Sequence, residues 1–285
     1  MRPDYITEAS LTDFIDSALA EDIRDGDHSS LASIPSNARN TAFLLMKASG
    51  IVAGMDLAEI IFRKLDPTME ILSSVPDGTA VKEGDIILKI HGNSRAILSA
   101  ERLVLNCMQR MSGIATYTSY LTSLIANTNT KLLDTRKTTP NFRMMEKWAV
   151  LIGGGVNHRY GLFDMIMLKD NHVDFAGGIH KAVSATVDYL ASTGKDLKIE
   201  VETRNIEEVQ QALDTNKVDR IMLDNMTPEE MTRAVTLIAG RSETEASGGI
   251  TESTIQAAAA SGVDYISVGA LTHSVKSLDI SLKAQ

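Results

Sequence analysis

The sequence predicts an α/β protein in which a first third of mixed helices and strands precedes an incomplete α/β barrel of six or seven strands. From Lys131 onward, short apolar segments alternate with amphipathic segments of helical length, which is typical of a parallel sheet flanked by helices. The apolar segments follow one another at intervals of roughly 20–35 residues, which fits successive βα units. Polar, ionisable or glycine residues follow nearly every apolar segment. A barrel gathers such strand ends at one mouth, whereas a doubly wound sheet would concentrate them at one switch point.

The first third is expected to mix helices and strands. Ser10 is expected to cap a helix that ends near Glu21, because an acidic residue follows three positions later. We expect a turn at 26–30 and a helix at 98–127 that breaks at Ser112-Gly113. The other expected elements are strands at 41–48, 70–75 and 85–91 and a helix at 55–65.

The second part is expected to repeat a strand and a helix. The helices are expected at 206–213, 228–239 and 252–260 among others. The expected strands cover 131–134, 164–168, 197–201, 219–223, 244–246 and 265–268, with 156–160 as a candidate seventh.

Composition excludes several classes of protein. The 285 residues are 44% hydrophobic, and the formal net charge is −9, so neither disorder nor broad nucleic-acid binding is expected. No apolar run reaches the ~18 residues of a membrane span, and residues 1–6 lack the apolar stretch of a secretion signal. The single cysteine, Cys107, excludes an internal disulfide framework. We therefore expect a cytoplasmic protein with no membrane or nucleic-acid partner.

Cationic side chains follow two of the expected strands and also lie within the candidate seventh strand. Arg136-Lys137, flanked by hydroxyl residues, favours anion capture over an ordinary solvated loop. Three consecutive glycines precede His158-Arg159, and they favour a backbone close to a ligand over a flexible loop. Lys169 ends an apolar strand, where a lysine is an anion ligand, a Schiff-base nucleophile or a rim residue with its ammonium in water.

Acidic and glycine-rich strand ends complete the pattern. Glu202 and Asp224 end consecutive strands, and two carboxylates facing one cavity suit Mg²⁺ or ribose hydroxyls. They could equally form salt bridges with the cations. The last two strands end in Ser247-Gly248-Gly249 and Gly269, which favours a phosphate site at bare backbone amides over simple tight turns.

The chain closely resembles the quinolinate phosphoribosyltransferase family over almost its whole length. The matching segments are Glu21-Asp22, Gly26-Asp27, Glu101-Arg102, MSGIAT from Met111, DTRKTTP from Asp134, EKWAVLIGGGVNHRYGLFD from Glu146, MLKDNH from Met167, EVE from Glu200, MLDN from Met222, ASGGI from Ala246 and SVGALTHS from Ser267.

The resemblance implies an amino-terminal α/β open sandwich followed by an incomplete α/β barrel. It places the sandwich at 1–112, joined by a C-terminal tail at 273–285, and the catalytic barrel at 113–272.

The resemblance also implies the roles of individual residues. The expected catalytic residues are Lys137, Lys169, Glu202 and Asp224. The expected quinolinate-binding residues are Arg102, Thr135, Arg136, Lys137, His158, Arg159 and Lys169. Glu202 and Asp224 are expected at the ribose and Mg²⁺, directly or indirectly. The expected ribose and phosphate contacts further include Ala246, Ser247, Gly248, Ser267, Val268 and Gly269.

The implied reaction transfers phosphoribosyl from phosphoribosyl pyrophosphate to quinolinate and releases CO₂ and pyrophosphate, with Mg²⁺ and no organic cofactor. Arg102 is expected to act across a homodimer interface, and the choice between dimer and hexamer stays open. Two alternatives remain at this point: a Schiff-base aldolase that uses Lys169, and a paralogue associated with molybdate transport.

Overall fold

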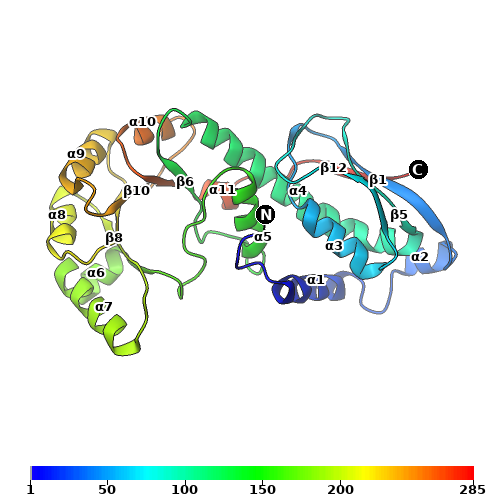
Figure 1. Cartoon of the computed structure of the whole chain (residues 1–285), viewed down its shortest axis with the longest axis horizontal. Helices are drawn as coiled ribbons and strands as arrows, with labels where there is room; N and C mark the ends of the chain where they lie inside the picture. The colour runs from blue at the N-terminus through cyan, green and yellow to red at the C-terminus, as the bar shows by residue number, and fades with distance from the viewer. Residues whose placement is uncertain (1) are drawn as a thin grey trace. The chain divides into compact units, whose positions relative to one another are not determined.

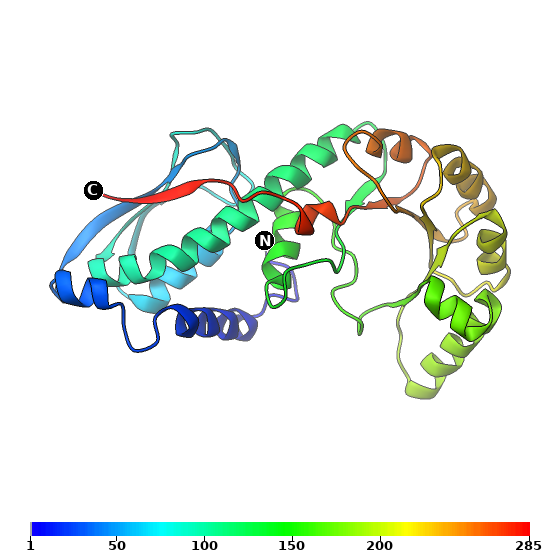
Figure 2. The ribbon, with the colours of Figure 1, turned by 180° about the vertical axis from the view of Figure 1, so that it is seen from behind.

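A computed structural model describes residues 2–285, and its chain divides into two compact units. Among the described residues, the first unit contains 2–119, 138–154 and 274–285, and the second contains 120–137 and 155–273. Figures 1 and 2 show both units from opposite sides. Within residues 2–285, no helix combines the length and apolar character that crossing a membrane would require.

The first unit is built on an antiparallel sheet with strand order β12-β1-β5-β3. Alternate residues of β1 are buried, which gives this sheet one apolar face, and α3 and α4 run alongside it (Figure 1). The elements of this unit are α1 (Glu8–Asp22), α2 (His28–Ser33), β1 (Arg39–Met46), β2 (Gly50–Ile51), α3 (Met55–Leu65), β3 (Glu70–Ser74), β4 (Ala80–Val81), β5 (Ile86–Asn93), α4 (Ser94–Leu124, whose last turn belongs to the second unit), α5 (Arg143–Ile152) and β12 (Ile280–Ala284).

The second unit is built on a parallel sheet with strand order β6-β11-β10-β9-β8-β7. Five strands stand in chain order, and β6 pairs with β11 at the far end. This is the order of a barrel that stays open between β6 and β7. The elements are β6 (Lys131–Leu133), β7 (Ile166–Leu168), α6 (Asp170–Ala176), α7 (Ile179–Thr193), β8 (Ile199–Thr203), α8 (Ile206–Asp214), β9 (Arg220–Asp224), α9 (Pro228–Ile238), β10 (Glu243–Ser247), α10 (Ile255–Ala260), β11 (Tyr265–Ser267) and α11 (Ala270–His273).

The predicted fold class is confirmed, and four local expectations need correction. Thr7, not Ser10, caps α1, because Thr7 and Ser10 each accept the other's backbone N–H. The expected turn at 26–30 contains the start of α2, because Asp27 accepts the Ser30 amide and caps that helix. The candidate seventh strand at 156–160 reduces to a single parallel bridge between Leu133 and Val156.

The expected break at Ser112-Gly113 is also wrong, because α4 continues through both residues. The C-terminal tail explains the glycine. The Leu278 amide donates to the Gln109 carbonyl at 2.9 Å, and the Arg110 Nη1 donates to the Val275 carbonyl at 2.9 Å. A Cβ at Gly113 would press into the backbone carbonyl of Lys276, so the glycine permits a close approach of two backbones.

Replacing this glycine by alanine should destabilise the protein although alanine favours helices. We expect Gly113→Ala to lower the free energy of unfolding by about 1–2 kcal/mol, because overpacking against a backbone outweighs the gain in helix propensity. Asn106→Ala on the exposed side of α4 is the control, and it should leave stability unchanged or slightly increased. Chemical denaturation measures both, and a stabilised Gly113→Ala variant would contradict the close approach.

Candidate active site

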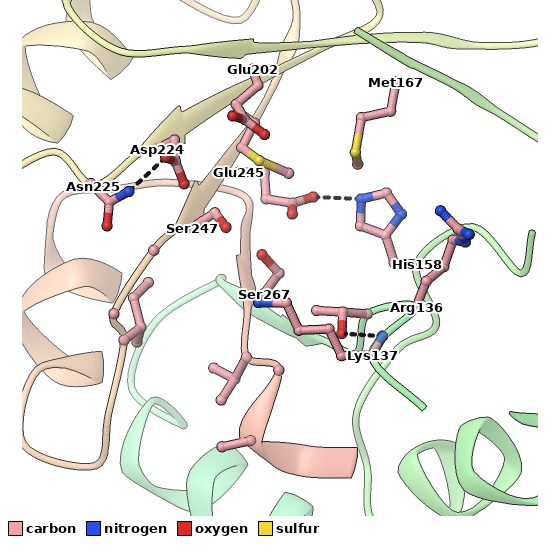
Figure 3. A pocket seen from close by; sticks show the side chains of 18 of the residues that line it. Arg136, Lys137, His158, Met167, Glu202, Asp224, Asn225, Glu245, Ser247 and Ser267 are labelled. Atoms are coloured by element: carbon pink, nitrogen blue, oxygen red, sulfur yellow. Dashed lines mark hydrogen bonds and ion pairs between the residues drawn. The ribbon is translucent and has the colours of Figure 1, made fainter. Parts of the chain in front are cut away.

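A cavity of about 710 Å³ lies in the second unit at the carboxyl ends of the parallel strands. Figure 3 shows the side chains that converge on it from several strands. Most of the residues that the sequence singled out line this cavity. They are Thr135, Arg136, Lys137, His158, Arg159, Lys169, Glu202, Asp224, Ser247, Gly248, Ser267, Val268 and Gly269.

Strand register explains why these side chains meet. Side chains alternate between the two faces of a strand, and β8, β9 and β10 pair in parallel. Glu202 pairs with Met222, and Ser247 pairs with Asp224. The polar residues of neighbouring strands therefore reach the same mouth from the same face of the sheet.

The loop after β6 presents Arg136 and Lys137. The Lys137 amide donates to the Thr135 hydroxyl at 3.0 Å, and the Thr272 hydroxyl donates to the Lys137 carbonyl at 2.7 Å. These bonds satisfy the backbone on both sides of Lys137 and leave its side chain at the exposed rim. The loop therefore has a defined conformation that carries two adjacent cations.

Asp134, at the end of β6, holds the neighbouring segment. Its carboxylate is fully buried and accepts the His158 amide at 2.8 Å and the Asn157 side-chain amide at 2.6 Å. A buried carboxylate needs such donors, because leaving it without them costs several kcal/mol or more. The pairing fixes the backbone of His158 beside the end of β6.

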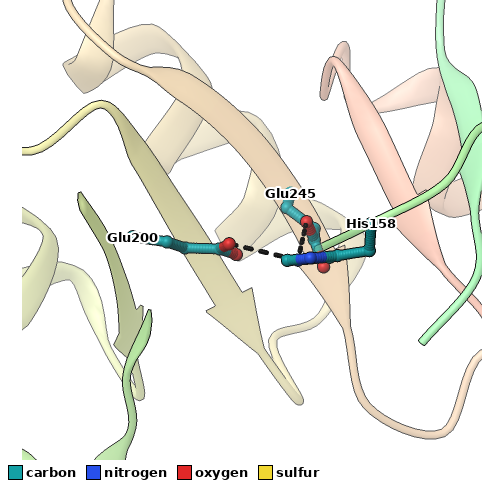
Figure 4. A group of neighbouring side chains, drawn as sticks. All are labelled: His158, Glu200 and Glu245. Carbon is teal, nitrogen blue, oxygen red and sulfur yellow. Dashed lines mark ion pairs between the residues drawn. The ribbon is translucent and has the colours of Figure 1, made fainter. Parts of the chain in front are cut away.

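The His158 side chain points at two buried carboxylates (Figure 4). Its Nε2 lies 3.1 Å from Glu200 Oε2 and 3.2 Å from Glu245 Oε2. The Arg159 amide nitrogen lies 2.6 Å from Nδ1. Although burial by itself lowers the pKa of the imidazole, Glu200 and Glu245 outweigh it and raise the pKa to about 9. The two carboxylates therefore favour the protonated, positively charged ring.

Arg159 is half-buried beside other cations. Burial lowers the pKa of its guanidinium, and the charge of Arg136 lowers it further. Its Nη1 donates to the Met165 carbonyl at 3.1 Å. The guanidinium groups of Arg159 and Arg136 repel each other. An anion bound by both groups would relieve this repulsion, so the pair is suited to an anion.

The opposite wall carries the carboxylates. Lys169 Nζ lies 3.3 Å from Glu202 Oε2, so the cation and acid walls meet at this pair. The Asn225 side-chain amide donates to Asp224 at 2.6 Å. Asn225 itself has a positive φ of 55°, a conformation that asparagine tolerates better than most residues. A Cβ at Gly248, where φ is +90°, would overlap the Asn225 amide, so this turn requires glycine.

Two expected site residues lie elsewhere among the described residues. Arg102 is exposed on α4 in the first unit, and Ala246 is buried inside β10 directly before the lining residue Ser247. Lining residues absent from the expected set are Met167, Met222, Asn225, Glu245, Gly249, Ile250, Thr251, Ala270 and His273.

The most important residues that the sequence-based prediction missed are two buried glutamates within the strands. Glu200 and Glu245 are fully buried, and the signal for them was present in the sequence. Each stands at an alternate position from a strand-end polar residue, Glu200 before Glu202 and Glu245 before Ser247. Period-two spacing places each pair on one face, so acids inside an apolar run indicate a polar barrel interior.

Two domain models of one protein family match most of the chain. Residues 27–112 match the N-terminal domain of quinolinate phosphoribosyl transferases, and residues 114–283 match their C-terminal domain. The chain is 48% identical over 281 residues to quinolinate phosphoribosyltransferase [decarboxylating] 1b of Nicotiana tabacum, covering 93% of this chain and 80% of the relative.

Two nicotinate-nucleotide pyrophosphorylases are also similar to this chain. A chloroplastic nicotinate-nucleotide pyrophosphorylase [carboxylating] of Arabidopsis thaliana is 49% identical over 283 residues, covering 93% of this chain and 80% of the relative. The solved nicotinate-nucleotide pyrophosphorylase of Francisella tularensis superposes with a TM-score of 0.91 at 40% identity, covering 98% of each chain. The chain belongs to the quinolinate phosphoribosyltransferase family, and its activity is that of a carboxylating nicotinate-nucleotide pyrophosphorylase in NAD biosynthesis.

Proposed function

We propose that the cavity of the second unit holds quinolinate against its cationic wall and phosphoribosyl pyrophosphate against its acidic and glycine-rich wall. The observation that carries this division is the separation of charge within one cavity. Arg136 and His158 lie on one side of the cavity, and Glu202 and Asp224 lie on the other (Figure 3).

Quinolinate is a dicarboxylate, so its subsite needs several cations. Arg136, His158 and Arg159 would bind its carboxylates, with Thr135 as a further polar contact. Charge-assisted hydrogen bonds to carboxylates are the strong ones in proteins. Lys137 follows Arg136 in the loop after β6, and Lys169 Nζ lies 3.3 Å from Glu202 Oε2. Both lysines would contact quinolinate and the pyrophosphate.

The 5′-phosphate would bind at the ends of β10 and β11. Glycine turns expose backbone N–H groups there, and such groups together with helix N-termini are suited to phosphate. Ala246 is buried, so its contribution would come through the backbone. The residues of this subsite are Ala246, Ser247, Gly248, Ser267, Val268 and Gly269.

The donor set at the strand ends fits Mg²⁺. Glu202 and Asp224 are oxygen ligands that line the same cavity, and Mg²⁺ is commonly bound by one or two carboxylates together with substrate phosphates. These two residues would hold the ion, directly or through water. When bound, Mg²⁺ neutralises charge on the pyrophosphate leaving group.

The chain's residues would then act on charge that develops during the reaction. The pyridine nitrogen attacks C1′ of the ribose as the C1′–pyrophosphate bond breaks. Glu202 and Asp224 stabilise the positive charge on the ribose, and Lys137 and Lys169 stabilise the leaving pyrophosphate. The electron pair of the broken C2–carboxylate bond stays on C2 when the 2-carboxylate departs as CO₂. The positive charge of the adjacent pyridinium nitrogen stabilises this pair until C2 takes up a proton. This sequence requires no organic cofactor.

The ion pair of Lys169 with Glu202 argues against a Schiff-base aldolase. A Schiff-base aldolase needs one lysine that is free to attack a carbonyl, whereas Lys169 Nζ lies 3.3 Å from Glu202 Oε2 in a cavity that several further cations line. A molybdate-transport paralogue would release no CO₂ from quinolinate. We further propose a cytoplasmic homodimer in which Arg102 completes the partner's quinolinate subsite, with association of dimers into a hexamer as the alternative assembly.

Replacing Lys169 or Arg159 with alanine should abolish turnover without unfolding the protein. Each change removes a charge-assisted contact of ~1.5–3 kcal/mol, and the reaction needs several at once. Release of labelled CO₂ from carboxyl-labelled quinolinate, with phosphoribosyl pyrophosphate and Mg²⁺, measures the activity. Arg204→Ala is the control, because Arg204 pairs with Asp174 and Glu208 outside the cavity. Near-normal activity in Arg159→Ala would contradict the assigned site, and no release by the wild type would contradict the function.

Nicotinate should be a poor substrate. It lacks the 2-carboxylate, so it leaves buried cations unpaired and offers no group to lose as CO₂. Competition assays with phosphoribosyl pyrophosphate compare nicotinate with quinolinate. Comparable kcat/KM values would show that the cationic wall does not select a dicarboxylate.

Subunit mixing tests whether Arg102 acts in trans. Arg102→Ala and Lys169→Ala variants should each be inactive, and a heterodimer should regain activity because one of its two sites is complete. Mixing Lys169→Ala with Arg136→Ala is the matched control, since every site then carries one defect. Absence of activity in the first mixture, with exchange verified by mass spectrometry, would place Arg102 in its own chain's site.

A further inference from the structure

The interior of the barrel holds charged side chains that the proposed reaction does not use. Glu200 on β8, Arg220 on β9 and Glu245 on β10 point to one face of the sheet, because Glu200 pairs with Arg220 and Glu245 with Met222 in the strand register. Both glutamates are fully buried, and Arg220 is 8% exposed. Burying charges costs free energy even when they are paired, so stability alone is a poor reason for them.

Arg220 contacts two glutamates and a tyrosine on neighbouring strands. Its Nη1 lies 3.1 Å from Glu245 Oε2, its Nη2 lies 3.0 Å from Glu243, and its guanidinium stacks on Tyr265 at 4.1 Å from the ring centroid. Glu245 therefore stands between two groups, Arg220 below and His158 above. For Glu200, the ion pair that the structure shows is with His158.

These contacts hold His158 from two directions. Asp134 fixes its backbone amide, while Glu200 and Glu245 both face Nε2 (Figure 4). Because Nε2 points toward the two glutamates in the barrel interior, the orientation of the ring relative to the cavity is fixed. A cation held in place before the substrate arrives loses little entropy on binding.

We propose that Glu200 and Glu245 are positioning residues for quinolinate binding: through Nε2 they orient the His158 ring and keep it positively charged. The proposal rests on the assignment of His158 to the quinolinate subsite. It makes the barrel interior a source of substrate selectivity, because the two buried acids sustain the cation that recognises a carboxylate.

The balance of charge around the ring supports this role. Glu200 and Glu245 face it from β8 and β10, Arg220 lies behind Glu245, and Arg159 follows it in the chain. Although burial opposes protonation, the two carboxylates raise the pKa of His158 to about 9. Removing one carboxylate should lower this pKa, so the ring would lose its charge at a lower pH.

Glu245→Gln tests the proposal, with Glu243→Gln as a matched control. Glu243 lies on the same strand, two residues away, and also pairs with Arg220. At pH 8 we expect Glu245→Gln to raise the KM for quinolinate about tenfold, with the KM for phosphoribosyl pyrophosphate unchanged. At pH 6 protonation of the ring is favoured in both proteins, so the effect should be smaller than at pH 8. Glu243→Gln should match the wild type at both pH values.

A purely structural role would produce other results. An equal rise in the KM for both substrates, or a rise independent of pH, would overturn the proposal. So would a full additional loss from Glu245→Gln in a His158→Asn background, because the carboxylate acts through the imidazole. Stoichiometric Zn²⁺ binding that Glu245→Gln abolishes would reassign the cluster as a metal site. If Glu245→Gln fails to fold, judged by thermal unfolding, Glu200→Gln undergoes the same tests.

The outcome separates this proposal from the proposed function. If His158→Asn raises the KM for quinolinate but Glu245→Gln and Glu200→Gln do not, only the positioning role fails. If His158→Asn leaves that KM unchanged while CO₂ is still released, the role of His158 in the quinolinate subsite fails. Loss of CO₂ release by the wild type would overturn the function itself.

Discussion

The site depends on the alternation of side chains along parallel strands that are buried on both faces. Every residue of β8 is buried, so its two acids, Glu200 and Glu202, must find partners inside the barrel. Glu202 meets Lys169 at the mouth, and Glu200 meets His158 one layer deeper. The same alternation therefore makes a reactive mouth and the charged layer beneath it.

This arrangement joins two requirements that usually conflict. A pocket for a dicarboxylate needs several cations close together, yet cations in a partly buried site repel one another. Burial and the charge of Arg136 lower the pKa of Arg159, while Glu200 acts in the opposite direction. Buried acids such as Glu200 would thus serve as counter-ions for the cations of the site.

Much of the fold and of the site could be predicted from sequence, for reasons that are local. The βα rhythm after Lys131 and the polar residues at each strand end depend on neighbours a few positions apart. Sequence alone could not show that Gly113 sits inside a continuous helix, because its reason is the carbonyl of Lys276 far along the chain. Sequence alone also could not identify the cap of α1. Both Ser10 and Thr7 carry a hydroxyl that can cap a helix, and only the three-dimensional geometry shows that Thr7 does so.

What the sequence by itself determined is the order of strands and helices and the residue types at each strand end, since both follow from short-range periodicity. The tertiary structure decided which strand ends meet and what lies beneath them. The cluster of His158, Glu200 and Glu245 combines a loop and two strands, and no spacing in the chain encodes their approach. Only the assembly of the parallel sheet, with β6 beside β11, surrounds those side chains and removes them from water.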